Sequence, residues 1–122
     1  MIKLIIGVVL LIFVLLYFFP VIQICGYSMF PTLTDGEFYL GRRVFRKNLC
    51  KRGEIYVYKP PYSGREERYV IKRLHEIYVD KYGKTHYYFL GDNSDDSYDS
   101  RYYGYVPSHN IVAHIVKKRG VK

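Results

Sequence analysis

Tryptophan is absent from the sequence, and cysteine occurs only twice in 122 residues, at Cys25 and Cys50. The two cysteines show neither CxxC spacing nor a Cys/His ligand pattern, which argues against a zinc site. Sequence cannot place their Cα atoms within the roughly 7 Å that a disulfide requires, so their pairing is left open. We expect no metal and no cofactor, because the scattered histidines are read as strand or surface residues: His75, His86, His109 and His114.

Charge is missing from the N-terminal stretch LIIGVVLLIFVLLYFF, which covers Leu4–Phe19. Extended to Ile2 and Ile22, the apolar segment has 21 residues. At helical rise this length is about 31 Å, which is enough to span a bilayer. Aromatic residues and Pro20 stand at its end, as is typical of a membrane interface. The sequence therefore predicts a transmembrane helix.

A cleaved leader is the alternative to an uncleaved anchor. A signal peptide has an apolar core of about 7–15 residues and a small-x-small cleavage site. The apolar run here is longer, and no such site follows it; lipoprotein-type cleavage before Cys25 would want a small residue where Ile24 stands. We therefore expect an anchor over residues 1–24 and one domain over residues 25–122, since roughly a hundred residues suffice for about one domain with a modest core.

Acidic residues are fewer than basic residues, 11 against 19, and the formal net charge is +8. Every Lys and Arg except Lys3 lies after the anchor. The positive-inside bias applies to short loops, and a domain of about 100 residues translocates largely regardless of its charge. We expect the domain outside the cytoplasm, where its cations would attract anionic lipid headgroups at about 1 kcal/mol each. A basic surface without function is an equally open reading.

No internal repeat and no long helical period follows the anchor, and the 15 tyrosines favour β-strands. Period-two patterns bounded by Gly, Pro and Asp predict strands. A first strand is expected in FPTLTDGEFYLGRRVF, running through Phe45. The other expected strands cover Glu54–Tyr58, Arg68–Asp80, Thr85–Gly91 and Asn110–Lys118, and KYGK is expected to form a hairpin turn. We predict a mainly β fold, a small antiparallel domain of five or six strands tethered by one N-terminal transmembrane helix.

Three polar features stand out in this domain: Ser28 directly after the anchor, Lys72 inside an apolar strand, and the loop GDNSDDSYDSRYYG. A serine hydroxyl is a weak nucleophile without a base, and no histidine here stands in a triad motif. Lysine can be the base when burial lowers its pKa of about 10.4 by 3–5 units. Taken singly, Ser28 as a turn serine and Lys72 as a strand residue reaching water would be the simpler readings.

The segments SMFPTL, RGEIYVYKPP, YVIKR and GDNSDDSYDSRYYGYVP resemble, in this order, the four sequence boxes of bacterial type I signal peptidase. The resemblance covers most of the chain from Gly26 to Pro107. It implies that Ser28 is the nucleophile and Lys72 the general base. It also implies a supporting set: Ser97 orienting the lysine, Asp99 and Arg101 bracing the loop through a salt bridge, Asp92 paired with Arg73, and Asn93 beside them.

The resemblance further implies the substrate and the location. The substrate would be a secretory preprotein with small residues, often alanine, at the first and third positions before the cut. Bound as an extended strand, it would gain main-chain hydrogen bonds, while shallow pockets select the side chains. The protein would lie in the bacterial cytoplasmic membrane as a single-pass protein. The residues matching the pocket wall are Met29, Leu33, Val70 and Ile71.

Two features depart from larger relatives. Gly26 stands where some members place a serine whose hydroxyl helps to bind the oxyanion. Only 17 residues, Leu74 to Leu90, separate IKR from GDN, where larger relatives hold an extra β cap. The resemblance is therefore to a minimal catalytic core without the large cap, in which the backbone N–H of Ser28 carries more of the oxyanion stabilisation.

Other functions were weighed against this one. A conjugation-type maturation peptidase would use the same two residues on another substrate, whereas the self-cleaving repressor peptidases have no reason to carry an anchor. A tethered basic module could bind nucleic acid through Lys, Arg and Tyr, but it leaves the GDN segment unexplained, and we expect no nucleic acid partner. A calcium loop is disfavoured because Ser97 and Tyr103 stand where that motif demands Gly and Glu.

Overall fold

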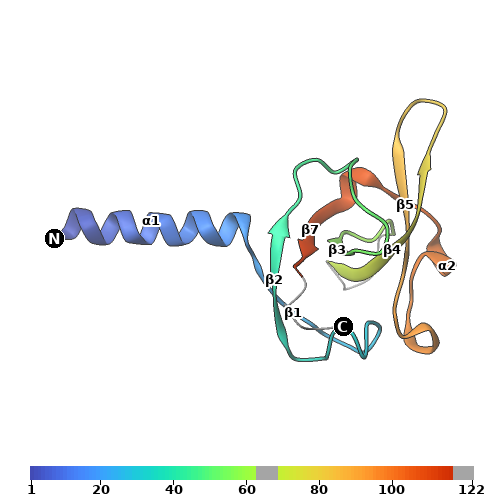
Figure 1. The fold of residues 1–122 in the computed structure, drawn as a ribbon, viewed down its shortest axis with the longest axis horizontal. Helices are drawn as coiled ribbons and strands as arrows, with labels where there is room; N and C mark the ends of the chain where they lie inside the picture. The colour runs from blue at the N-terminus through green and yellow to red at the C-terminus, as the bar shows by residue number, and fades with distance from the viewer. Residues whose placement is uncertain (63–68, 117–122) are drawn as a thin grey trace.

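The computed structural model describes residues 1–62 and 69–116. One helix projects from a small body made of a single seven-stranded sheet (Figure 1). The strand order is β1-β2-β7-β3-β4-β5-β6, and the neighbouring strands pair antiparallel. The elements are α1 (Ile2–Phe18), β1 (Val21–Gln23), β2 (Phe38–Arg43), β3 (Ile55–Tyr58), β4 (Val70–Val79), β5 (Thr85–Leu90), η1 (Ser94–Asp96), α2 (Ser100–Tyr103), β6 (Val106–Pro107), η2 (Ser108–Asn110) and β7 (Ile111–Ile115). The expectation of a small, mainly antiparallel β domain is confirmed.

Helix α1 is shorter than the apolar segment predicted from the sequence. It has 17 residues and ends at Phe18, because Pro20 carries no N–H and disfavours helical dihedrals at Phe19, which is at φ −127° and ψ 74°. The expected extension to Ile22 is wrong, since Ile22 lies in β1 opposite Tyr39 of β2. In the part of the chain that the structure describes, no helix combines the length and hydrophobicity needed to cross a membrane.

The two shortest strands were missed by the sequence analysis. β1 has three residues and β6 has two, which is too short for a period-two pattern to show. The first predicted strand is present only as β2, Phe38–Arg43. The residues before it belong to the turn that carries Ser28. Predicted residues beyond the described ranges include Arg68 and Lys118. The sheet therefore has seven strands rather than five or six.

The predicted long strand exists as β4, and it contains an irregularity. A register shift between Leu74 and Glu76 puts an extra residue opposite β5, and such a bulge bends a strand and increases its twist. The turn to β5 is held by Asp80, whose carboxylate accepts the N–H groups of Tyr82 and Lys84 at 2.8 and 3.0 Å. Gly83 takes the positive φ of 78° that this turn requires.

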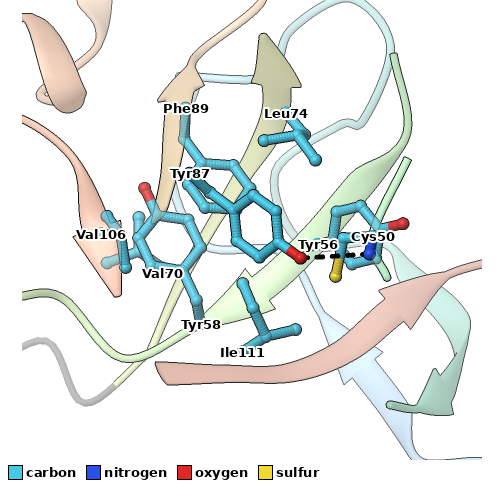
Figure 2. Close-up of a cluster of buried hydrophobic side chains, with 9 residues drawn as sticks. All are labelled: Cys50, Tyr56, Tyr58, Val70, Leu74, Tyr87, Phe89, Val106 and Ile111. Atoms are coloured by element: carbon cyan, nitrogen blue, oxygen red, sulfur yellow. Dashed lines mark hydrogen bonds between the residues drawn. The ribbon is translucent and has the colours of Figure 1, made fainter. Parts of the chain in front are cut away.

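The core consists of two clusters. The first is aromatic (Figure 2), and in it the rings of Tyr58 and Phe89 stack with centroids 4.1 Å apart. The second is aliphatic and is built from Ile24, Met29, Leu33, Ile55, Val57, Ala113 and Ile115. Both cysteines are free, with Cys50 in the aromatic cluster and Cys25 exposed. The clusters support the two chain segments that converge at the site, the Ser28 turn and the loop after β5.

Candidate active site

Ser28 lies in a turn between β1 and β2, and backbone hydrogen bonds hold both ends of this turn. Ile24 N–H donates to the carbonyl of Glu37 at 2.9 Å, and Gly36 N–H donates to that of Ile24 at 2.7 Å. Gly26 has φ +97°, a conformation open to glycine, and its N–H donates to the Asp35 carboxylate at 2.7 Å. The turn therefore presents a half-buried Ser28 at the surface of the sheet.

Lys72 occupies a core-facing position of β4. Alternation along the strand puts it on the same face as the buried residues Val70 and Leu74. Its residue exposure is 5%, which is unusual because charged amines are almost never fully buried without a partner. Lys72 Nζ lies 2.8 Å from Ser28 Oγ. The fold thus joins two residues that are 44 positions apart into one hydrogen-bonded pair.

Asn93 ties the loop after β5 to the Ser28 turn. Its backbone N–H donates to the carbonyl of Ser28 at 2.8 Å, and its side-chain amide donates to the carbonyl of Tyr27 at 3.0 Å. The preceding Asp92 N–H contacts the sulfur of Met29 at 3.4 Å. Three successive residues of the turn are therefore fixed by two residues of this loop.

Asp92 also joins β4 to the same turn. Arg73 donates to both of its carboxylate oxygens, from Nε at 2.8 Å and from Nη2 at 2.7 Å. Thr32 donates from its hydroxyl to Oδ2 at 2.5 Å. The hydrogen bond to Asp92 raises the pKa of Arg73, which keeps the guanidinium charged. The paired oxygens fit the two-pronged geometry in which an arginine binds a carboxylate most strongly.

Asp99 is fully buried and organises the end of the loop. Its carboxylate accepts the N–H of Gly91 at 2.9 Å, the hydroxyl of Ser97 at 2.8 Å, and Nε and Nη2 of Arg101 at 2.9 and 3.0 Å. Burial raises the pKa of Asp99, but the hydrogen bonds from Arg101, Gly91 and Ser97 outweigh burial and lower it to about 2. The carboxylate is therefore ionised at neutral pH.

Gly91 lies at a close approach between the loop after β5 and the Ser28 turn. A Cβ built on it would meet the side chain of Ser97, including Cβ at 2.6 Å, and the carbonyl oxygen of Ser28 at 2.7 Å. Only glycine allows this approach. Sequence reasoning quoted the GDN segment but did not single out Gly91 or Thr32. Both residues could have been found from the sequence, because Gly91 lies in GDN and Thr32 lies in SMFPTL, two segments that carry the family resemblance.

A groove of about 620 Å³ runs over the pair. Ser28, Lys72, Met29, Val70 and Ile71 line it, which places three of the four expected wall residues. Leu33 is 4% exposed and packs into the aliphatic cluster, and it is not among the lining residues. The sequence analysis missed the aromatic part of the wall, which is formed by Tyr27, Tyr62, Tyr69 and Tyr98.

The described residues leave little other buried polarity. Within these ranges the buried polar or charged residues are Lys72, Asp99 and Ser100. Ser100 accepts the N–H of Phe89 at 2.9 Å, so all three adjoin the loop or the Ser28 turn. In residues 1–62 and 69–116, no three His, Cys, Asp or Glu side chains gather as metal ligands would. The arrangement offers a hydroxyl, a buried amine and a groove, which suits acyl transfer.

Comparison with known proteins places this arrangement in a family. The family model described as signal peptidase, peptidase S26, matches residues 1–77 and 79–117. Mitochondrial inner membrane protease subunit 1 of Schizosaccharomyces pombe is 32% identical over 118 residues, which cover 84% of this chain and 74% of that protein. Signal peptidase I of Buchnera aphidicola subsp. Baizongia pistaciae is 46% identical over 44 residues, covering 30% of this chain.

A second Buchnera relative, signal peptidase I of subsp. Acyrthosiphon pisum, is 50% identical over 34 residues, covering 28% of this chain. The matched stretches span 14% and 11% of the lengths of the two Buchnera proteins. The resemblance stated from the sequence segments is confirmed by the family match over most of the chain. The chain therefore belongs to the signal peptidase family, peptidase S26.

Proposed function

We propose that this protein is a membrane-bound serine endopeptidase that removes N-terminal signal peptides from secreted preproteins. Ser28 is the nucleophile and Lys72 the general base. The observation that carries the proposal is the 2.8 Å contact between Ser28 Oγ and the Nζ of a lysine that is 5% exposed. Burial disfavours the charged form of an amine, and a neutral amine beside a serine hydroxyl can accept its proton.

The first half of the reaction forms an acyl-enzyme. Ser28 Oγ attacks the carbonyl carbon of the scissile bond while its proton passes to Lys72 Nζ. The backbone N–H of Ser28 supports the developing oxyanion, and Gly26 adds no side-chain donor there. When the C–N bond breaks, the Lys72 ammonium returns the proton to the leaving amine. The mature protein leaves with a free N-terminus, and the signal peptide stays esterified to Ser28.

The second half releases the signal peptide. A water molecule attacks the ester carbonyl and gives its proton to the neutral Lys72. The Lys72 ammonium then protonates Ser28 Oγ as the ester C–O bond breaks. One amine thus serves as base and acid in both halves, which a histidine does in the Ser-His-Asp arrangement.

Ser97 is proposed to orient Lys72. Its hydroxyl hydrogen is directed at Asp99 Oδ2 at 2.8 Å, so its oxygen lone pairs are left to accept a hydrogen bond from the amine. The Arg101 side chain and Gly91 N–H fix Asp99 in turn. Asp92, Asn93 and Arg73 would position the nucleophile's turn through the contacts described above. These residues act through Ser28 and Lys72 rather than on the substrate.

The substrate is proposed to lie as an extended strand along the groove. Met29, Val70 and Ile71 line the groove beside Ser28, and pockets shaped by such side chains would admit small residues such as alanine. Main-chain hydrogen bonds from an added strand would supply affinity without sequence demands. This suits secretory preproteins whose signals differ in sequence but end in small residues.

Membrane attachment is proposed to come from residues 1–24, with residues 25–122 on the extracytoplasmic side of the bacterial cytoplasmic membrane. The exposed side chains of α1 support this, because after Lys3 the helix carries no charge and has no buried residue. Exposed apolar side chains are favoured in an apolar environment over water. The Ser28 turn follows the anchor closely, so it would meet the scissile bond where a signal peptide leaves the bilayer.

The test is cleavage of a preprotein whose signal ends in Ala-x-Ala by the detergent-solubilised protein, with the cut mapped by mass spectrometry. We expect cutting after the final Ala by the parent and none by Ser28→Ala. Cutting by Ser28→Ala would overturn the nucleophile assignment. A folded parent that leaves this substrate intact but cuts a conjugation pilin precursor would instead make it a specialised maturation peptidase.

A further inference from the structure

A second hollow lies away from the Ser28–Lys72 pair, beside the connection between β2 and β3. Its volume is about 500 Å³, and four cations line it with one carboxylate, namely Arg42, Arg43, Arg46, Lys51 and Glu54. Phe45 and Leu49 also line it, and both are 59% exposed. We propose that this basic pocket binds the phosphate of an anionic phospholipid headgroup.

The loop between β2 and β3, which carries Arg46 and Lys51, is ordered by the core. Tyr87 donates its hydroxyl hydrogen to the carbonyl of Lys47 at 2.6 Å and accepts the N–H of Cys50 at 3.1 Å, a contact drawn in Figure 2. Tyr56 accepts the N–H of Lys51 at 2.9 Å. The hydroxyl groups of two core tyrosines thus hold one surface loop through hydrogen bonds. A pre-ordered loop binds an anion with less entropy cost than a mobile one.

His114 also lines the pocket. Both of its ring nitrogens are buried and make no hydrogen bond in the described structure, and the Glu54 carboxylate lies 3.6 Å from its Nε2. Burial lowers the pKa of His114, Glu54 raises it, and Arg42 and Lys51 lower it further. A phosphate bound among the lining cations would lie beside this ring and change its surroundings.

The pocket adjoins the end of α1, which selects a lipid as the source of the phosphate. Arg43 donates from Nε to the carbonyl of Tyr17 at 2.7 Å, and its guanidinium lies 4.4 Å from the Tyr17 ring centroid. The ring of Phe45 lies 5.6 Å from that of Phe18. The inference rests on the proposed anchoring: where α1 leaves the bilayer, headgroup phosphates surround it.

The pocket combines cationic side chains with exposed apolar side chains, which matches the charged headgroup and the apolar chains of a phospholipid. The cations would contact the phosphate at the headgroup level, where each adds attraction to an anionic surface. Phe45 and Leu49 on the rim would reach toward the acyl boundary, as aromatic and aliphatic residues of interfacial segments do. A free phosphate would use the cations but not this rim. Arg43 also lines the groove, so an occupied pocket would hold the body with its groove close to the membrane surface.

The test titrates the full chain in dodecyl maltoside micelles with dihexanoyl phosphatidylglycerol, and reads the ring resonances of His114 by NMR. Dihexanoyl phosphatidylcholine and inorganic phosphate are titrated separately. The variant is Arg46→Gln with Lys51→Gln. The matched control is Lys81→Gln with Lys84→Gln, which removes the same charge from the turn between β4 and β5. Peptide cleavage is followed in the same samples, so failure of lipid binding is distinguishable from failure of the proposed peptidase activity.

We expect phosphatidylglycerol to shift the His114 resonances at lower concentration than either other probe. The half-saturating concentration should rise roughly tenfold in the Arg46/Lys51 variant and stay unchanged in the control. Equal weakening in both variants would reduce the effect to net charge and overturn the site. Saturation by inorganic phosphate at the same concentration would make it a free-anion site and overturn the lipid. Unshifted His114 resonances would overturn the pocket altogether.

Discussion

The two halves of β4 obey the same alternation but lie in different surroundings. In the near half, Val70–Leu74, alternate residues are buried, and β3 pairs with the strand up to Arg73. In the far half, Glu76–Val79, the described partner is β5 alone, and most residues are exposed. Lys72 in the near half is therefore enclosed, whereas Lys81 and Lys84 at the far turn are solvent-exposed. The exposure of a lysine here therefore depends on its position along the chain from β4 to β5 rather than on its residue type.

The largest expected effect on turnover distinguishes Lys72 in the near half of β4 from Lys81 at the far turn. Lys72→Arg should lower turnover about a thousandfold or more, because an arginine cannot lose its proton and cannot act as a general base. Lys81→Arg keeps the charge at the far turn and should leave turnover unchanged. Steady-state cleavage of the Ala-x-Ala preprotein measures both. Normal turnover by a folded Lys72→Arg variant would require another base.

Two glycines, Gly91 beside the Ser28 turn and Gly83 at the far turn, allow the same comparison between the two regions. Gly91→Ala should lower kcat about a hundredfold, because the added Cβ meets the Ser28 carbonyl and displaces the Ser28 turn. Gly83→Ala at the far turn meets nothing within 4 Å but takes a positive φ. It should cost about 1 kcal/mol of stability without changing kcat. Similar kcat losses in both variants would contradict the close approach at Gly91.

Acid should lower the stability of the folded protein by protonating Asp99. Its folded pKa of about 2 lies below the usual aspartate value of 3.8, so its stabilisation is complete above about pH 4 and is lost as the pH falls toward 2. This difference corresponds to about 2–3 kcal/mol. Denaturant unfolding should show Asp99→Asn less stable than the parent at pH 6, with the gap narrowing at pH 2.5. The exposed control Asp95→Asn should match the parent at both pH values, and a constant gap for Asp99→Asn would contradict the account.

The smallest expected effect compares two aspartates that each hold a turn. Asp92→Asn weakens the paired contacts to Arg73 and the contact to Thr32, and it should reduce kcat roughly tenfold, as the loss of about 1.4 kcal/mol of positioning would. Asp80→Asn weakens the far turn and should leave kcat unchanged. Turnover with a short peptide substrate distinguishes them. Equal rates for Asp92→Asn and the parent would remove the positioning role.

The near half was largely predictable from sequence because local pattern and chemistry agreed there. The order of four segments placed Ser28, Lys72 and the loop in one site through the family resemblance, whereas the apolar alternation around Lys72 left open whether its amine is buried or reaches water. The pairings of Arg73 with Asp92 and of Asp99 with Arg101 match opposite charges that the segments contain. Burial of Leu33 in the core was not predicted, because sequence spacing does not say which side of a turn packs inward.

The remaining features depend on contacts between distant segments. β1 and β6 are too short to carry a pattern, and they form because a neighbouring strand offers free backbone groups. The end of α1 at Phe18 follows from Pro20, but the apolar composition concealed the change to strand at Val21. Gly91 gains its importance from the approach of Ser28, and the tyrosine hydroxyls that order the β2–β3 connection come from residues far along the chain. Such features become visible only when the sheet is assembled.

The most direct test of the central claim replaces the amine and then restores it. Lys72→Cys should be inactive, and treatment with 2-bromoethylamine should return cleavage by rebuilding a primary amine at nearly the same length. Treated Ser28→Ala, in which the exposed Cys25 is also modified, should stay inactive and serves as the control. Recovery of cutting after the final Ala in treated Lys72→Cys alone is the result predicted here. Activity of Lys72→Cys before treatment would contradict Lys72 as the base.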